Sequence, residues 1–416
     1  MTTVESIKIF PWRGSTPHFC FAIIFCLAQF AWSAGPWDLE RLSKPPRMFP
    51  AGSPQADGLR AFFYAGPDWK GRPTRVFAWY GEPAGKGATR FPAMVLVHGG
   101  GGTAFADWVK LWNDRGYAAI AIDTCGSVPS KGYGEPTFDV HRPRNEFSGP
   151  ACWEDSFSQT DLAPPDQWSY HAIADIILAD SLLRSFPHVD PRRIGITGIS
   201  WGGYLTALAA AVDSRFHFAV PVYGCGFLGE DSVWVPDFQK MGTIKASRWL
   251  GLWDPSRYLR NARMPMLWVA GTNDFAYPLD SLQKSYLLPQ RLPALSIRMR
   301  MPHSQEEGAI PEEIHAFADQ YSRSGIPLAR VGKPGMQGSR AWVIYRSKVP
   351  IARAELTFTL DGGPWKEYAG RAVAANVQSN QSNVTATLPA GVRAFYFNLV
   401  DSRGLVISSL HTTLRP

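Results

Sequence analysis

Short, continuously apolar runs recur along the first three quarters of the chain, and segments with helical spacing separate several of them. Runs of this kind are typical of strands that are buried on both faces of a sheet. Strands that alternate with helices build a mostly parallel sheet with helices on both faces. We therefore predict an α/β fold with a doubly wound sheet. The expected strands are 61–64, 74–80, 93–97, 118–122, 194–197, 218–222, 266–270 and 295–301, and the expected helices include 168–186 and 311–324.

The expected strand at 194–197 leads into a tight turn that carries a serine. The turn has the form G-x-S-x-G, with Gly198, Ser200 and Gly202. A serine on such a strand-to-helix turn has a strained backbone, and small residues two positions to either side let the turn close. The geometry lifts the serine oxygen above the sheet and directs the first N–H groups of the following helix at its target. Ser200 is therefore a candidate nucleophile, although an ordinary glycine-rich loop would contain the same pattern.

A serine hydroxyl needs a base to take its proton, and the base needs a third group that holds its tautomer and stabilises its charge. Asp274 follows the expected strand 266–270, and His303 follows the expected strand 295–301. The order Ser200, Asp274, His303, with each residue at the end of its own strand, is the order of the α/β-hydrolase arrangement. We predict that these residues form a catalytic triad. The alternative acids and bases are Asp254, Asp280, His141 and His171.

The negative charge that develops during acyl transfer requires preorganised N–H donors. We expect one donor to be the backbone N–H of Trp201, directly after the serine. The other is expected from Gly100 or Gly101, because a backbone without side chains can approach the substrate closely. His98 is expected to order this glycine run rather than to transfer protons.

Aromatic residues are expected to line the site. The chain contains 16 tryptophans, whose rings offer stacking faces for sugars, although most are expected to pack in the core or in the cover of the site. We predict that Trp201, Tyr277 and Trp153 contact the substrate.

Two long segments interrupt the alternation of strands and helices. Segment 124–167 is rich in proline, glycine and charged residues and leaves the end of a central strand, so we expect it to lie over the site. Within it, Arg142 and Arg144 are expected to be solvated, with pairing to a substrate carboxylate as the alternative. Segment 226–262 is a second candidate cover.

The pattern changes after about residue 327, where apolar and polar residues alternate within short runs separated by turn residues. This alternation is typical of antiparallel sheets with one solvated face. We predict that a catalytic domain spans residues 34–327. A small all-β sandwich of the immunoglobulin or fibronectin type is predicted to span residues 328–416.

The first 33 residues have the features of a secretory signal peptide. Lys8 and Arg13 precede the apolar run 19–28, and a cleavage point is expected after Ser33 or Ala34. The run is shorter than the roughly 20 apolar residues that span a membrane. We therefore expect a secreted or periplasmic protein without a stable membrane anchor after cleavage, with an uncleaved anchor as the alternative.

Three cysteines would remain after such a cleavage, namely Cys125, Cys152 and Cys225. In an oxidising compartment they permit one disulfide and one free thiol. The sequence leaves the pairing open.

The formal net charge of +7 is spread over scattered lysines and arginines, and the chain has no basic run. Nucleic acid is therefore not an expected partner. The sequence contains no C-x-x-C or H-E-x-x-H pattern, so we expect neither a metal nor another cofactor. These features do not determine the oligomeric state.

Segment 60–325 resembles the α/β-hydrolase superfamily, and within it the branch of acetyl xylan esterases, dienelactone-hydrolase-like proteins and prolyl oligopeptidase catalytic domains. The resemblance implies an acyl-enzyme mechanism with Ser200 as nucleophile, His303 as base and then acid, and Asp274 as the residue that orients His303. It rests on the motifs at 98–101, 190–195, 198–204, 271–274 and 302–303.

The chain departs from two groups of this branch. Dienelactone hydrolases carry cysteine where Ser200 stands. Prolyl oligopeptidases place a β-propeller before the hydrolase, whereas only about 60 mature residues precede the hydrolase here. Their oxyanion loop often offers a tyrosine hydroxyl, and no tyrosine follows closely after Gly102.

We therefore expect a serine hydrolase that cleaves carboxylic esters of small molecules or polysaccharides, such as acetyl esters. The alternatives are a serine peptidase of the prolyl oligopeptidase or Xaa-Pro dipeptidyl-peptidase type, and a non-catalytic binding protein on the same fold.

Overall fold

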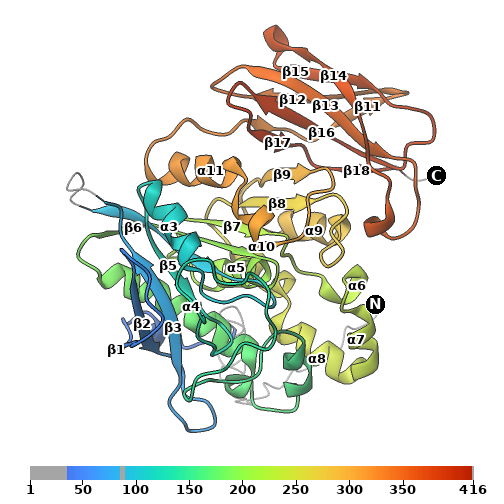
Figure 1. Ribbon diagram of the computed structural model, residues 1–416. Coiled ribbons are helices and arrows are strands. Elements are labelled where there is room, and N and C mark those ends of the chain that lie inside the picture. The colour runs from blue at the N-terminus through green and yellow to red at the C-terminus, as the bar shows by residue number, and fades with distance from the viewer. Residues whose placement is uncertain (1–34, 85–89, 415–416) are drawn as a thin grey trace, which may run out of the picture.

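The computed structural model describes residues 35–84 and 90–414, which are organised around two sheets (Figure 1). The predicted signal peptide, residues 1–33, lies outside the described residues. Within the described ranges, no helix has the length and apolar character needed to cross a membrane.

Nine strands form the first sheet in the order β1-β2-β3-β5-β4-β6-β7-β8-β9. Strands β1 to β3 run antiparallel to their neighbours, whereas β4 to β9 pair in parallel. The predicted mostly parallel sheet is therefore confirmed. The strands are β1 Met48–Pro50, β2 Arg60–Ala65, β3 Arg75–Gly81, β4 Phe91–Val97, β5 Ala118–Ile122, β6 Val189–Ile199, β7 Phe218–Val222, β8 Leu267–Gly271 and β9 Ala294–Arg298.

Helices lie on both faces of this sheet (Figure 1). The chain steps from β4 to β5 in one direction and from β5 to β6 in the other, so right-handed crossovers place α3 and α4 on opposite faces. Trp112 of α3 packs against His315 of α11 with ring centroids 4.7 Å apart, so these two helices share a face. The helices are α2 Leu39–Leu42, α3 Ala106–Asp114, α4 Trp168–Ser185, α5 Trp201–Val212, α6 Leu228–Asp231, α7 Val235–Met241, α8 Thr243–Trp253, α9 Leu279–Tyr286, α10 Gln305–Ala309 and α11 Glu312–Ser322.

Three segments have features beyond the predicted strands and helices. In the segment before residue 60, Trp37 is buried and packs on the rings of Tyr170 and Trp253. Strand β9 ends earlier than expected, because Arg300 has a φ of 50°, which is incompatible with an extended strand. Segment 124–167 contains two 3₁₀-helices, η1 Trp153–Gln159 and η2 Pro164–Asp166.

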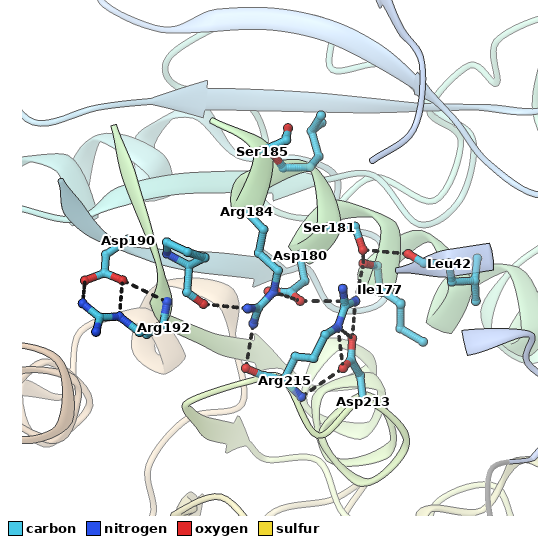
Figure 2. A network of polar contacts seen from close by, with 12 residues as sticks. Leu42, Ile177, Asp180, Ser181, Arg184, Ser185, Asp190, Arg192, Asp213 and Arg215 are labelled. Carbon is cyan, nitrogen blue, oxygen red and sulfur yellow. Dashed lines mark hydrogen bonds and ion pairs between the residues drawn. The ribbon is translucent and has the colours of Figure 1, made fainter. Parts of the chain in front are cut away.

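A network of polar contacts ties α4 to the amino end of β6 and to the connection between α5 and β7 (Figure 2). The buried Asp180 accepts a hydrogen bond from Arg184 at 2.7 Å and lies 3.3 Å from Arg215. Arg184 also donates to the carbonyls of Pro191 and Arg215, each at 2.6 Å. Since β6 starts here and the predicted site lies beyond its other end, the network positions the α4–α5 layer without touching the site.

The second sheet contains nine antiparallel strands, in the order β10-β12-β15-β14-β13-β16-β17, with β11 beside β12 and β18 beside β16. Strand β14 pairs with β13 through its first residues and with β15 through its last, so the sheet folds over on itself. The predicted antiparallel character is confirmed, and the immunoglobulin or fibronectin type stays a prediction. The strands are β10 Arg330–Val331, β11 Gly335–Gln337, β12 Arg340–Arg346, β13 Ile351–Thr359, β14 Arg371–Gln378, β15 Asn383–Thr387, β16 Ala394–Asp401, β17 Val406–Ser408 and β18 Thr412–Thr413.

The second sheet covers β9, the last strand of the first sheet (Figure 1). The carbonyl of Ile297 in β9 accepts hydrogen bonds from Tyr396 at 3.3 Å and from Asn398 at 3.1 Å. The N–H of Ile297 donates to the hydroxyl of Ser408 at 2.8 Å. Side chains of the second sheet thus satisfy backbone groups that an edge strand would otherwise leave unpaired.

His411 is a buried histidine at this junction. It is 4% exposed, its Nδ1 lies 3.2 Å from the hydroxyl of Tyr286 in α9, and its ring packs edge-on against Trp365. Burial lowers the pKa of His411 to about 3. His411 is therefore neutral in the folded chain at pH values where an unfolded histidine, with a pKa of about 6.5, is protonated.

We predict that the free energy of unfolding decreases as the pH falls from about 6.5 to 4, by about 1.4 kcal/mol per pH unit for His411 alone, because only the unfolded chain binds the proton. His171 and His315, whose burial lowers their pKa values to about 4, add to the same slope. Urea unfolding at several pH values should give a shallower slope for His411→Gln. The matched control is His141→Gln, at an exposed position. An unchanged slope of unfolding free energy against pH in His411→Gln would contradict the lowered pKa of His411.

Candidate active site

Ser200 occupies the sharp turn between β6 and α5, with a φ of 59° and a ψ of −119°. This backbone conformation is strained for a residue with a side chain. A Cβ at Gly198 would lie 2.2 Å from the carbonyl oxygen of Gly202, and a Cβ at Gly202 would lie 2.0 Å from the carbonyl oxygen of Val97. Both positions therefore require glycine if the turn is to close onto β4.

The structure brings Ser200, Asp274 and His303 together as the sequence predicts. Nε2 of His303 lies 2.8 Å from Oγ of Ser200, and Nδ1 lies 2.8 Å from Oδ2 of Asp274. Oδ1 of Asp274 accepts the backbone N–H groups of Ala276 at 2.9 Å and Tyr277 at 2.8 Å. A neutral imidazole that donates Nδ1–H to the carboxylate leaves Nε2 free to accept the serine proton.

Aromatic rings hold the imidazole of His303 in place. The ring of Tyr223 stacks on it with centroids 4.5 Å apart, and that of Phe275 lies 4.9 Å away. The hydroxyl of Tyr223 donates to the carbonyl of Pro302 at 2.6 Å and so links the end of β7 to the loop that carries His303. Tyr223 was not among the predicted site residues, although its position directly after a buried strand was an available signal.

The alternative acids and bases lie elsewhere. Asp254 accepts the backbone N–H groups of Phe227 and Leu228 and caps that turn. Asp280 lies on α9, 3.9 Å from Lys284. His171 is buried on α4, where its Nε2 lies 2.9 Å from the carbonyl of Pro165, and His141 is exposed.

The glycine run 99–102 passes directly beside the serine turn. A Cβ at Gly99 would lie 3.0 Å from Cβ of Ser200, and a Cβ at Gly100 would lie 3.1 Å from the indole of Trp201. Gly101 has a φ of 68°, a left-handed conformation that favours glycine. The run thus brings bare backbone to the cavity above the serine.

His98 orders this run, as expected. Its Nε2 accepts the N–H of Thr124 at 3.0 Å, which leaves Nδ1–H to donate to the carbonyl of Gly99 at 2.8 Å. Burial lowers the pKa of His98, so the neutral tautomer required by these two hydrogen bonds is favoured.

Arg142 corrects the expectation of a solvated loop arginine. Its buried guanidinium donates to the carbonyls of Gly101 at 3.0 Å and Gly102 at 2.9 Å, and it pairs with the buried Glu135 at 3.2 Å. The alternative role, binding of a substrate carboxylate, does not fit these contacts, because the guanidinium is already occupied. Arg142 instead fastens segment 124–167 to the glycine run.

A cavity of about 610 Å³ opens above Ser200 and His303. Trp153 and Trp201 line it, whereas Tyr277, which we expected to contact the substrate, does not. Tyr277 is 1% exposed and packs behind the site, edge-on against Trp234, because its backbone N–H is engaged by Asp274.

Both predicted cover segments contribute to the cavity. Segment 124–167 supplies Thr137, Phe138, Val140, Trp153 and Glu154, and segment 226–262 supplies Val233, Trp234 and Asp237. A disulfide between Cys125 and Cys152 joins the end of β5 to the start of η1 and so closes the first segment at its base. Among the described cysteines, Cys225 is a free thiol, and it is buried. The described residues contain no cluster of three side chains suited to bind a metal ion.

Comparisons with known proteins agree with this geometry. Residues 163–297 match the prolyl oligopeptidase family. The match lies within the α/β-hydrolase-like part of the chain. The chain is 24% identical over 276 residues to the uncharacterized peptidase YuxL of Bacillus subtilis (strain 168), a match that covers 62% of this chain and 35% of that protein. The chain thus spans about a third of the length of this curated relative.

Two solved structures share the fold. The acetyl xylan esterase from Paenibacillus sp. R4 superposes with a TM-score of 0.54 at 21% identity, over 70% of this chain and 93% of that one. Acetyl xylan esterase 1 from Thermoanaerobacterium sp. JW/SL YS485 gives a TM-score of 0.50 at 17% identity, over 71% and 97% of the two chains. The predicted resemblance to the α/β-hydrolase fold is therefore confirmed.

We predict that Arg142→Lys slows covalent labelling of Ser200 by a fluorophosphonate about tenfold, because a lysine cannot replace the forked hydrogen bonds that hold the glycine run. Arg144 is the matched control. It donates to the carbonyls of Cys125, Gly149 and Pro150 in the same segment but not to the glycine run. Equal labelling rates for Arg142→Lys and Arg144→Lys, with both variants folded, would refute this role.

Proposed function

We propose that this protein is a serine hydrolase that cleaves carboxylic esters through an acyl-enzyme intermediate. The observation that carries the proposal is the hydrogen-bonded chain Ser200–His303–Asp274 at the floor of an open cavity. The structural likeness to two acetyl xylan esterases supports the fold, and acetyl esters of small molecules or polysaccharides are the substrates that we propose.

In this mechanism Nε2 of His303 takes the proton from Oγ of Ser200 as Oγ attacks the ester carbonyl carbon. Asp274 keeps Nδ1–H in place and stabilises the imidazolium. We assign the oxyanion to the N–H of Trp201 and to an N–H of Gly100 or Gly101, which all border the cavity. His303 then gives the proton to the leaving alcohol oxygen. Water hydrolyses the acyl-enzyme by the same steps, with His303 again as base.

The proposed substrate contacts are those of Trp153 and Trp201, which both line the cavity. The match of residues 163–297 to the prolyl oligopeptidase family favours peptidase activity as the second candidate function. The two functions differ in the leaving group that His303 must protonate, an alcohol or an amine.

We predict that the wild type hydrolyses 4-nitrophenyl acetate and is labelled by a fluorophosphonate, and that Ser200→Ala loses both. Asp274→Asn should lower kcat by about 10³- to 10⁴-fold, because the amide favours the wrong imidazole tautomer. Xaa-Pro 4-nitroanilides serve as the comparison substrates. Faster hydrolysis of these amides than of acetyl esters would replace the esterase assignment with the peptidase, and an unlabelled, folded wild type would exclude both.

We also propose that residues 1–33 are removed on export. The disulfide between Cys125 and Cys152 supports this, because disulfides persist in oxidising compartments. Expression of the full chain in a bacterial host should place a protein that begins at Ala34 or Gly35 in the periplasm or the medium, as judged by N-terminal mass spectrometry. Recovery of the chain from the cytosol with Met1 or Thr2 at its start would contradict export.

A further inference from the structure

The lining of the cavity above Ser200 is acidic. Three carboxylates, those of Glu154, Asp237 and Glu306, are among the described residues that line it, and no lysine or arginine is. The chain as a whole has a formal net charge of +7. The sign of the charge in the cavity is therefore opposite to that of the whole molecule.

Glu154 is the carboxylate whose position is best defined. Its Oε1 accepts a hydrogen bond from Nε1 of Trp234 at 2.7 Å and another from Nε1 of Trp201 at 3.2 Å. It follows Cys152, which the disulfide anchors, by two residues. Two indole donors and a disulfide thus hold the group before any substrate arrives. Among the described residues, no lysine or arginine forms an ion pair with it.

The other two carboxylates add to the same field. The hydroxyl of Thr137 donates to Glu306, and this hydrogen bond lowers the pKa of Glu306. Asp237 lies half-buried on α7, in the second cover segment. The cavity therefore has negative groups on both cover segments, 124–167 and 226–262, and close to His303.

Aromatic rings lie beside this charge. The rings of Trp201 and Trp234, which donate to Glu154, lie with centroids 4.7 Å apart, and the indole of Trp153 also lines the cavity. Aromatic faces together with a carboxylate attract a substituted ammonium group through cation–π and Coulomb interactions. A neutral sugar could stack on the same rings and donate hydroxyl hydrogen bonds to the carboxylate, but it would lack the Coulomb attraction between opposite net charges.

We propose that Glu154 is a specificity-determining residue that binds a positively charged group of the substrate, so that the Ser200 site prefers esters carrying a substituted ammonium. This inference rests on the proposed esterase function and adds the charge of its substrate. The cationic group belongs either to the acyl part or to the alcohol part, and both sources have the same chemistry at Glu154.

The test compares esters that differ only in charge. For the alcohol part, the pair is acetylcholine and 3,3-dimethylbutyl acetate, in which a carbon replaces the charged nitrogen. For the acyl part, the pair is the 4-nitrophenyl esters of 4-(trimethylammonio)butanoate and 5,5-dimethylhexanoate. We expect kcat/KM to be about tenfold or more higher for the cationic member of at least one pair, with an advantage that shrinks as salt is added.

Glu154→Gln removes the charge and keeps an oxygen that can accept both indole N–H bonds. We expect the ratio of cationic to neutral kcat/KM to fall about tenfold in this variant, mainly through KM for the cationic ester. The control is Asp155→Asn, which removes the same charge one residue away from a side chain that does not line the cavity. Its ratio should match the wild type. Fluorophosphonate labelling of each variant verifies that the site is intact.

The inference would be overturned if the wild type hydrolysed all the esters with a ratio of cationic to neutral kcat/KM near one for both pairs. The esterase proposal would remain. An equal fall of this ratio in Glu154→Gln and Asp155→Asn would attribute the effect to general surface charge. That result would also overturn the inference. Absence of both hydrolysis and labelling in the folded wild type would remove the esterase proposal and this inference together.

Discussion

The arrangement of the whole site depends on a close backbone contact between the end of β4 and the start of α5. The carbonyl oxygen of Val97 in β4 lies so close to Gly202 that a single added carbon would collide with it. The same contact brings the start of α5 against the end of β4, and with it the glycine run that follows β4. The strained turn at Ser200 is stable because the surrounding sheet and helix leave it no other conformation.

The residues that share an edge of the sheet were predictable from the sequence. Parallel strands end at the same edge, so Ser200, Asp274 and His303 could be placed together from the ends of three apolar runs. The elements themselves followed from periodicity, as the agreement of β5 with the expected strand at 118–122 shows. These are short-range properties, because each depends on residues that are neighbours in the chain.

The roles that the sequence could not predict depend on contacts across long loops. Arg142 looked like a solvated charge because its partners, the carbonyls of Gly101 and Gly102, lie about 40 residues away in the chain. Tyr277 follows the acid so closely that it looked like part of the cavity wall, yet its N–H binds Asp274 and its ring points behind the site. The pairing of Cys125 with Cys152 likewise required the path of segment 124–167.

The second sheet has a consequence for how the chain becomes competent. Asp274 follows β8 and His303 follows β9. Backbone groups of β9 are satisfied by Tyr396, Asn398 and Ser408, near the end of the chain. During synthesis, β9 therefore lacks these hydrogen-bond partners until residues about a hundred positions later have been made. A chain cut before β16 would keep Ser200, Asp274 and His303 and yet present a bare strand edge, open to pairing with other chains. The C-terminal sheet therefore completes the hydrogen bonding of the first sheet and is not structurally independent of it.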